Sequence, residues 1–241
     1  MANKEHLSIL QQGRQAWEQF RKEQPSIHPD LSSANLSGWD LSGFDLSGAN
    51  LMDANLSHAN LTKAVMIGTN LAEANLFDIN LTQAILKQAN LNEVDAEDIT
   101  ATDSDFSHAT LIKADLSKGI LNGANFSNAN LHLTNFQNAT LKHATLQHTK
   151  FREANLNNAT LSEADFHGAD LGQSSFINAN LEGANLAETS LVQTNFQDCC
   201  IEHVKNLSEE RLAKAKTLTR ATMDSGLHDR MAKKYPGLFE N

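Results

Sequence analysis

The sequence predicts an all-β solenoid, a rod in which the chain turns a corner every five residues. Every fifth residue from Leu31 to Ile201 is large and apolar in thirty-three of thirty-five successive units, and the phase never slips. A period of five fits neither a helix, at about 3.6 residues per turn, nor a strand, at about 2. Tandem repetition of this kind is typical of solenoids, whose stacked repeats bury one continuous core.

Each unit has the same internal order of side chains. The central residue is the large apolar one, and the residue two before it is Ala in twenty units and Ser, Thr, Gly or Cys in nine more. We expect both to point inward, so that bulky and slim side chains fill the interior together. The residue between them is Asn or Asp in twenty-three units. Such short side chains favour turns because they hydrogen-bond nearby backbone groups.

The segments Ala49–Asp53, Ala54–His58 and Ala184–Glu188 resemble the pentapeptide repeat family, whose pattern is Ala-(Asp/Asn)-Leu-X-X. The resemblance covers about 175 of 241 residues. It implies a right-handed quadrilateral β-helix with four units per coil. Residues twenty apart would then stack at about 4.8 Å, the spacing of neighbouring strands.

Two adjacent units exchange their large and small positions. Their central residues are Ala96 and Ala101, whereas Val94 and Ile99 occupy the positions that are small elsewhere. Such an exchange is expected where both side chains share one packed interior, because the volume of a core must be conserved.

Residues 1–29 are predicted to be an N-terminal capping helix and linker ahead of the repeat region, residues 30–205. Leu7, Leu10, Trp17 and Phe20 recur at helical spacing across residues 4–23. An open solenoid end exposes apolar core and strand edges, so we interpret the segment as one amphipathic helix that covers this end. The alternative, a helix that binds a membrane or a partner, is disfavoured because the segment has no basic excess.

Residues 206–241 are predicted to form a C-terminal helical cap that contains two further repeat-like units. Ser208 precedes two acidic residues and suits the N-cap of a short helix. Leu218 and Met223 then resume the spacing of five, out of phase with the main run. A last helix around residues 224–234 could pack outside or mediate dimerisation, so we expect a monomer or a dimer through this cap.

The composition argues against several classes of protein. No apolar stretch approaches about 18 residues, the N-terminus lacks the features of a signal peptide, and only two cysteines occur. We therefore expect a cytoplasmic protein that does not insert into membranes. Phosphate-binding glycine loops, nucleophile elbows and zinc-ligand spacings are missing from the sequence. We expect no enzyme, no cofactor and no metal.

The repeat region is acidic. Residues 31–205 hold twenty acids and eight bases, a charge distribution that should repel nucleic acid and attract basic proteins. The acids are densest between Asp78 and Asp105, and no base lies between them after Lys87. These acids are the candidate partner surface, and the alternative is an ordinary solvated face. The candidate partner surface comprises Asp78, Glu93, Asp95, Glu97, Asp98, Asp103 and Asp105.

Outward apolar residues give two smaller candidate patches. Val65, Ile67 and Ile85 are expected to cluster on one face, and Ile112 lies one coil from Leu133 on another. Single apolar residues on a surface need no functional explanation, but a cluster is a candidate interface.

The sequence therefore favours a non-enzymatic protein that works as a rigid acidic scaffold for protein–protein interaction. The alternative is a DNA mimic that binds a type II topoisomerase such as gyrase, which the resemblance implies because the quinolone-resistance and mycobacterial members of the family are understood to act so. Against it, the acids gather toward one half of the rod, and no inserted loop interrupts the repeats.

Overall fold

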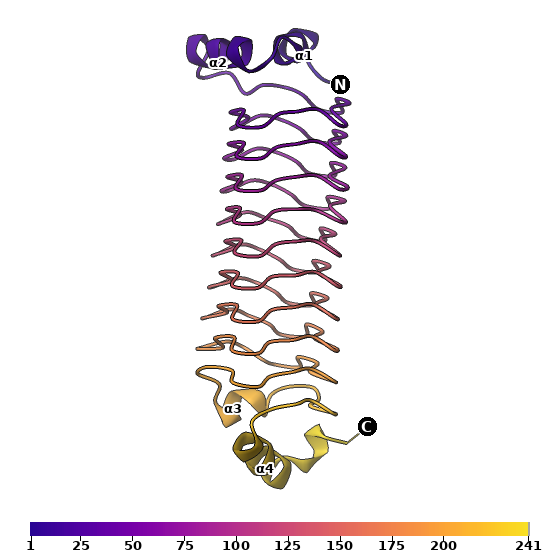
Figure 1. Cartoon of the computed structure of the whole chain (residues 1–241), viewed down its shortest axis with the longest axis vertical. Coiled ribbons are helices and arrows are strands. Elements are labelled where there is room, and N and C mark those ends of the chain that lie inside the picture. Colours follow the sequence, from indigo (N-terminus) through magenta and orange to yellow (C-terminus); the bar gives the residue numbers. More distant parts are fainter. Residues whose placement is uncertain (241) are drawn as a thin grey trace.

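The computed structural model describes residues 1–240 and shows a long rod with helices at both ends (Figure 1). The two termini lie at opposite ends of the rod (Figure 1). Parallel β-bridges join residues twenty apart along the whole repeat region, from Asp30 with Asn50 to Asn185 with Lys205. Four five-residue units therefore make each coil, as the resemblance implied.

Each unit contributes one bridged residue and one tight turn. The bridged residue precedes the central one, and the two residues after the central one form the tip of the turn. The second tip residue has a positive φ in most units, as at Glu73, Asp78 and Asn138 with φ of 60°, 52° and 62°. This left-handed conformation lets the chain turn a corner within five residues.

Asn and Asp are frequent at the bridged position because their side chains hold the turn. All twenty-three of them accept a hydrogen bond at Oδ1 from the backbone N–H two residues later, for example Asp45 from Ser47 at 2.9 Å. This local bond satisfies a donor that the turn would otherwise leave unpaired.

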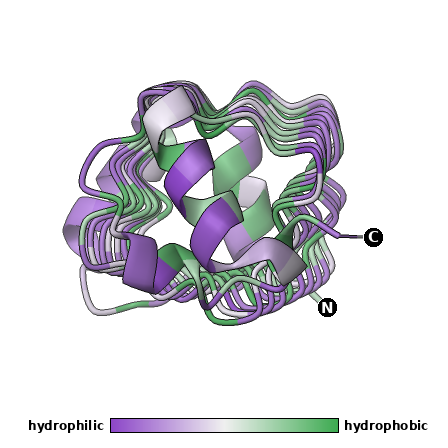
Figure 2. Ribbon diagram, turned by 90° about the horizontal axis from the view of Figure 1, so that it is seen from below, coloured by the Kyte–Doolittle hydropathy of each residue, from purple (hydrophilic) through white to green (hydrophobic). Residues whose placement is uncertain are grey.

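The core runs through the centre of the rod, inside a four-sided outline of stacked coils (Figure 2). The thirty-five central residues are at most 1% exposed. Phe106 and Phe126 stack in parallel one coil apart, with ring centroids 4.8 Å from each other. Ile99 occupies a normally small position, and an added Cβ at Gly119 would lie 2.8 Å from its Cγ2. The volume of Ile99 is thus accommodated by a glycine in the next coil as well as by its neighbour Ala101.

The N-terminal cap is two helices, so the prediction of one continuous helix was wrong. α1 (Lys4–Gln11) and α2 (Arg14–Glu23) are separated at Gly13, whose φ is +93°. Trp17 of α2 is fully buried, and its Nε1 donates to the carbonyl of Asp45 at 2.6 Å. The break lets both helices lie across the end of the first coil (Figure 1).

The C-terminal end combines helices with two further repeat units. α3 (Glu209–Leu212) lies at the end of the repeat region, after which Thr217 bridges Asn195 and Thr222 bridges Cys200. These two bridges span twenty-two residues, because the helical segment adds two residues to the coil.

α4 (Ser225–Lys234) and the short 3-10 helix η1 (Pro236–Leu238) follow these units at the C-terminal end of the rod (Figure 1). Met231 of α4 is fully buried. Within residues 1–240 no helix is long and apolar enough to span a membrane.

Candidate interaction surface

The four faces of the rod are numbered from the units of Leu31, Leu36, Leu41 and Leu46, in chain order. The corner that follows each face carries the two turn-tip residues of its units. Because the coils are in register, residues twenty apart form a column along the rod. The position of any outward side chain follows from this rule.

The acidic patch lies on the second face and its two corners. We define it as Glu93, Asp95, Glu97 and Asp98 in one coil, together with Asp78 one coil before. The structure therefore brings together five of the seven acids in the candidate partner surface. Their backbone is held by hydrogen bonds to both neighbouring coils, so the spacing of their Cα atoms is fixed.

Lysines of the next coil pair with two of these acids. Lys113 Nζ lies 2.9 Å from Glu93 Oε1, and Lys118 Nζ lies 2.6 Å from Glu97 Oε1. The hydrogen bonds that the two ammonium groups donate to these carboxylates raise the pKa of both lysines. Sequence reasoning missed these counter-ions because it looked for bases between the acids along the chain. The sequence does contain a signal for the first pair, because Lys113 follows Glu93 by twenty residues, the length of one coil.

The patch stays acidic after this pairing. Asp95 and Asp98 have no ion-pair partner among residues 1–240, and Asp78 contacts His58 Nδ1 at 3.0 Å. Seven acids and two lysines occupy this face and its corners from Glu73 to Lys118. The net charge is therefore about minus five over about 10 Å of rod.

The other two candidate acids lie elsewhere. Asp103 is exposed at the corner after the third face, and Asp105 is on the fourth face, away from the patch. Burial raises the pKa of the Asp105 carboxyl, but hydrogen bonds from Ser107 and Lys87 outweigh it and hold the pKa below its usual value. Asp105 is thus an internally paired group.

The predicted apolar patch is assembled on the fourth face and its corner. Val65 and Ile85 are bridged and half-buried, and Ile67 at the corner is 41% exposed. Asp45 and Asp105 flank the two bridged residues in the same column. Ile120, which sequence reasoning overlooked, is 46% exposed on the third face. These apolar areas are small and separate from one another.

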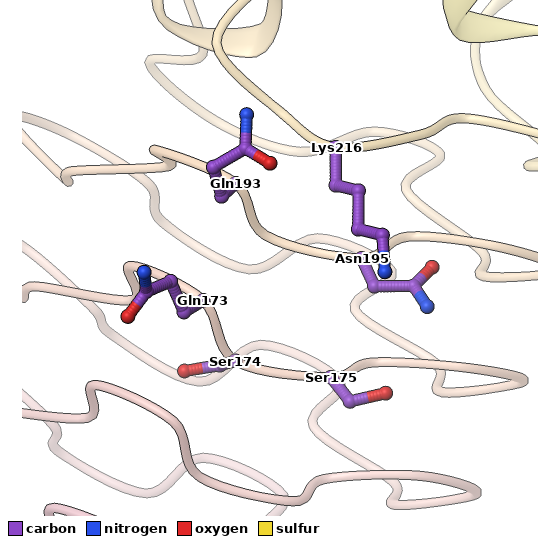
Figure 3. A pocket seen from close by; sticks show the side chains of 6 residues that line it. All are labelled: Gln173, Ser174, Ser175, Gln193, Asn195 and Lys216. Atoms are coloured by element: carbon purple, nitrogen blue, oxygen red, sulfur yellow. The ribbon is translucent and has the colours of Figure 1, made fainter.

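A polar hollow of about 340 Å³ lies near the C-terminal end of the second face. Lys216 reaches toward Asn195 from the C-terminal segment, with Gln173 and Gln193 on the opposite side (Figure 3). Ser174 is turned away from this hollow and donates to the carbonyl of Phe151. The hollow is therefore lined by amide groups, the cation of Lys216 and the hydroxyl of Ser175, which donates to Asn157 Oδ1 at 2.6 Å.

The histidines and cysteines of residues 1–240 do not gather into a metal-binding cluster. No three His, Cys, Asp or Glu side chains there converge as a metal site. His143 Nδ1 lies 3.6 Å from Glu163 at an exposed corner. Burial raises the pKa of the Cys199 thiol, which makes it a poor nucleophile.

Comparison with known proteins agrees with this geometry. The chain matches the family described as pentapeptide repeats at residues 30–68, 49–88 and 169–205. It matches the pentapeptide repeat region family at residues 99–171. No curated protein sequence matches this chain.

Two solved structures are similar over most of the rod. HetL from the cyanobacterium Nostoc sp. strain PCC 7120, described as involved in heterocyst differentiation regulation, is 26% identical with a TM-score of 0.67. The match covers 92% of this chain and 94% of HetL. QnrB1, a plasmid-mediated fluoroquinolone resistance protein, is 13% identical with a TM-score of 0.50, and the match covers 83% of this chain and 96% of QnrB1.

The likeness to QnrB1 concerns the fold alone. Together with the family matches, the two neighbours confirm the predicted fold class, a right-handed quadrilateral β-helix. The chain belongs to the pentapeptide repeat family.

Proposed function

We propose that this protein is a non-enzymatic scaffold whose acidic patch binds the basic surface of a protein partner. The observation that carries the proposal is the set of four acids from Glu93 to Asp98, of which Asp95 and Asp98 lack an ion-pair partner among residues 1–240. They lie within six residues on one face and its two corners, so their fields add and attract a cationic surface together.

The rigidity of the rod supports the same proposal. Each coil is hydrogen-bonded to the coils on both sides, and the patch needs no rearrangement before binding. A preformed surface loses little conformational entropy on association. We expect the protein to act in the cytoplasm, as a monomer or as a dimer through the C-terminal cap. Light scattering of the full chain and of a variant that lacks α4 distinguishes these two states.

The test compares partner capture from a lysate of the source organism by three forms of the protein. Asp95→Asn/Asp98→Asn removes two charges, while Asn retains the turn bond at position 95 and tolerates the φ of 60° at position 98. The control Glu182→Gln/Glu188→Gln removes two exposed charges at the far end of the rod.

Proteins retained by the wild type and the control should be lost with the patch variant. Their retention should also weaken as the salt concentration is raised, because salt screens the attraction between exposed charges. An identical set of bound proteins for all three forms would remove the proposal.

The second candidate, a DNA mimic that binds a type II topoisomerase, is favoured by the acidic charge. The charge covers about three coils of the second face, whereas Asn135, Asn155, Ser175 and Asn195 continue the same column without charge. A mimic of a phosphate backbone needs regular charge along its length. A supercoiling assay with gyrase decides between the two, and neither inhibition nor protection at micromolar protein eliminates the mimic.

A further inference from the structure

A groove on the first face has the opposite charge to the acidic patch. Its volume is about 510 Å³, and His132, His148, Lys150, Arg152 and Asp170 line it. We call it the basic groove. Three groups that are or can become cationic, His148, Lys150 and Arg152, are exposed there.

Two glycines leave the space that forms the groove. An added Cβ at Gly168 would lie 2.4 Å from His148 Nδ1, and one at Gly172 would lie 3.1 Å from Arg152 Nη1. Gly168 has a φ of +67°, the conformation that its turn position requires. The missing side chains give the His148 and Arg152 side chains room beside the next coil.

The donors of Lys150 and Arg152 are largely free. Lys150 lies between Asn130 and Asp170 in the column and has no ion-pair partner among residues 1–240. Arg152 Nη2 donates to Gln173 Oε1 at 3.2 Å. Arg152 Nη1 forms an ion pair with Asp170 Oδ2 at 3.6 Å, a distance too long for a hydrogen bond. A ligand can therefore receive hydrogen bonds from both cationic side chains.

The hydrogen bond of His132 determines what its ring offers to a ligand. His132 Nδ1 lies 2.9 Å from the carbonyl oxygen of Arg152, an atom that can only accept. The proton must therefore be on Nδ1, and the neutral ring presents Nε2 as an acceptor. When the ring is protonated, Nε2 becomes a donor. An anion in the groove favours the protonated ring.

Charged groups of both signs surround His132. Lys150 and Arg152 are cationic, whereas Asp170 and Glu153 are anionic. The His148 and His167 rings are 5.2 Å apart at the opposite corner of the first face. The charged and titratable groups around the groove are Lys113, His132, His148, Lys150, Arg152, Glu153, His167 and Asp170.

We propose that the basic groove binds a tetrahedral oxyanion, a phosphate or sulfate group, and that His132 takes up a proton on binding. Arginine and lysine together suit such a group, since guanidinium forms paired hydrogen bonds and ammonium supplies a point charge. Binding and protonation are reciprocal, so affinity for the oxyanion rises as the pH falls.

Sodium sulfate is the first probe because it remains a dianion across the pH range of interest. The full chain is titrated at pH 6.0 and pH 8.0 at constant ionic strength and followed by amide NMR shifts. We expect shifts centred on the basic groove and roughly tenfold tighter binding at pH 6.0. Inorganic phosphate should shift the same amides, and acetate should bind roughly tenfold more weakly.

Variants distinguish the contribution of His132 protonation to sulfate affinity from the contribution of the permanent positive charges. His132→Gln keeps an N–H donor for the Arg152 carbonyl but cannot titrate, so the affinity ratio between the two pH values should fall to about threefold or less. Lys150→Met should weaken binding at both pH values. The control Lys142→Met/His143→Gln changes the same residue types at an exposed corner of the third face and should leave binding unchanged.

Three results overturn the proposal. They are groove amides that do not respond to sulfate, a His132→Gln variant that keeps the full pH dependence, and acetate binding as tight as sulfate binding. Circular dichroism of each variant checks that the coils remain folded. At pH 8.0, the sulfate affinity of Lys150→Met tests the location of the site independently of His132.

Discussion

Gly119 provides a direct test of whether core volume is conserved along the rod. A Cβ at this position would lie 2.8 Å from Ile99 Cγ2 and 3.3 Å from Leu121 Cδ1. Overpacking of this kind costs about 1–3 kcal/mol. The φ of Gly119 is not positive, so the change to Ala also restricts the unfolded chain, which stabilises by about 0.4–1 kcal/mol. We expect Gly119→Ala to lower the free energy of unfolding by about 1–2 kcal/mol.

The contact with Ile99 predicts how this cost changes in a second background. Ile99→Ala alone should destabilise by about 2–5 kcal/mol, since Ile99 is fully buried. In the double variant the methyl group added by Gly119→Ala occupies part of the space that Ile99 vacates. The loss should therefore be smaller than the sum of the single losses by about 1–2 kcal/mol.

Urea unfolding followed by circular dichroism measures the four free energies of this cycle. The matched control combines Gly119→Ala with Leu161→Ala, a buried residue about two coils away. The control pair should be additive within about 0.5 kcal/mol. If Ile99→Ala/Gly119→Ala is also additive within that range, the glycine does not accommodate Ile99 and the argument for conserved volume between coils fails.

Three further predictions concern the cap, the cysteines and acid stability. Trp17→Phe leaves the Asp45 carbonyl without its donor, so it should lower the free energy of unfolding by about 1–3 kcal/mol. Amide hydrogen exchange should become faster in the first coil than in the last coil. A thiol reagent should modify half-buried Cys200 in the native protein and Cys199 only after unfolding, because burial raises the pKa of the Cys199 thiol. Asp105 has a folded pKa below the ordinary value of 3.8, so the stability it adds is present above that value and lost as the pH falls through the folded pKa. An acid titration by circular dichroism should therefore show a smaller loss of stability below pH 5 in Asp105→Asn than in the wild type; an equal loss in both would contradict the pairing.

The repeat region could be predicted because the residue type at each position is determined by contacts within its own unit and with adjacent units. The bridged Asn or Asp bonds the backbone two residues later, as Asp45 does with Ser47, and this bond needs no distant partner. The small and large inward positions need only to match their neighbours in the same core. A sequence that repeats such units specifies the coil without long-range information.

The N-terminal cap could not be predicted in the same way. Leu10 and Trp17 have helical spacing on both sides of Gly13, and a glycine inside a helix costs only about 1 kcal/mol. The break is favoured by burial, because two short helices cover the end of the first coil and place Trp17 against it. The dimensions of that end are a property of the folded rod.

The acidic patch was predicted in part, since its acids are visible in sequence but their counter-ions lie one coil away. Lys113 follows Glu93 by twenty residues, and Lys118 follows Glu97 by twenty-one. Once the coil length is known, such pairs can be read from the sequence. The fixed hydrogen-bond roles of the basic groove, above all that of His132, depend on side-chain conformations that spacing does not give.

The two surfaces can be occupied at once without affecting each other. Glu93 and Arg152 are about three coils apart, roughly 14 Å along the rod, which exceeds the Debye length of about 8 Å at physiological salt. Each coil contacts only its neighbours, and the closely packed core offers no second arrangement through which a change could pass. The Asp95→Asn/Asp98→Asn variant keeps the ion pair between Glu93 and Lys113, so it should leave sulfate binding in the basic groove unchanged. Mutual dependence at physiological salt would mean that the coils move relative to one another, and the rod could then not be treated as a rigid scaffold.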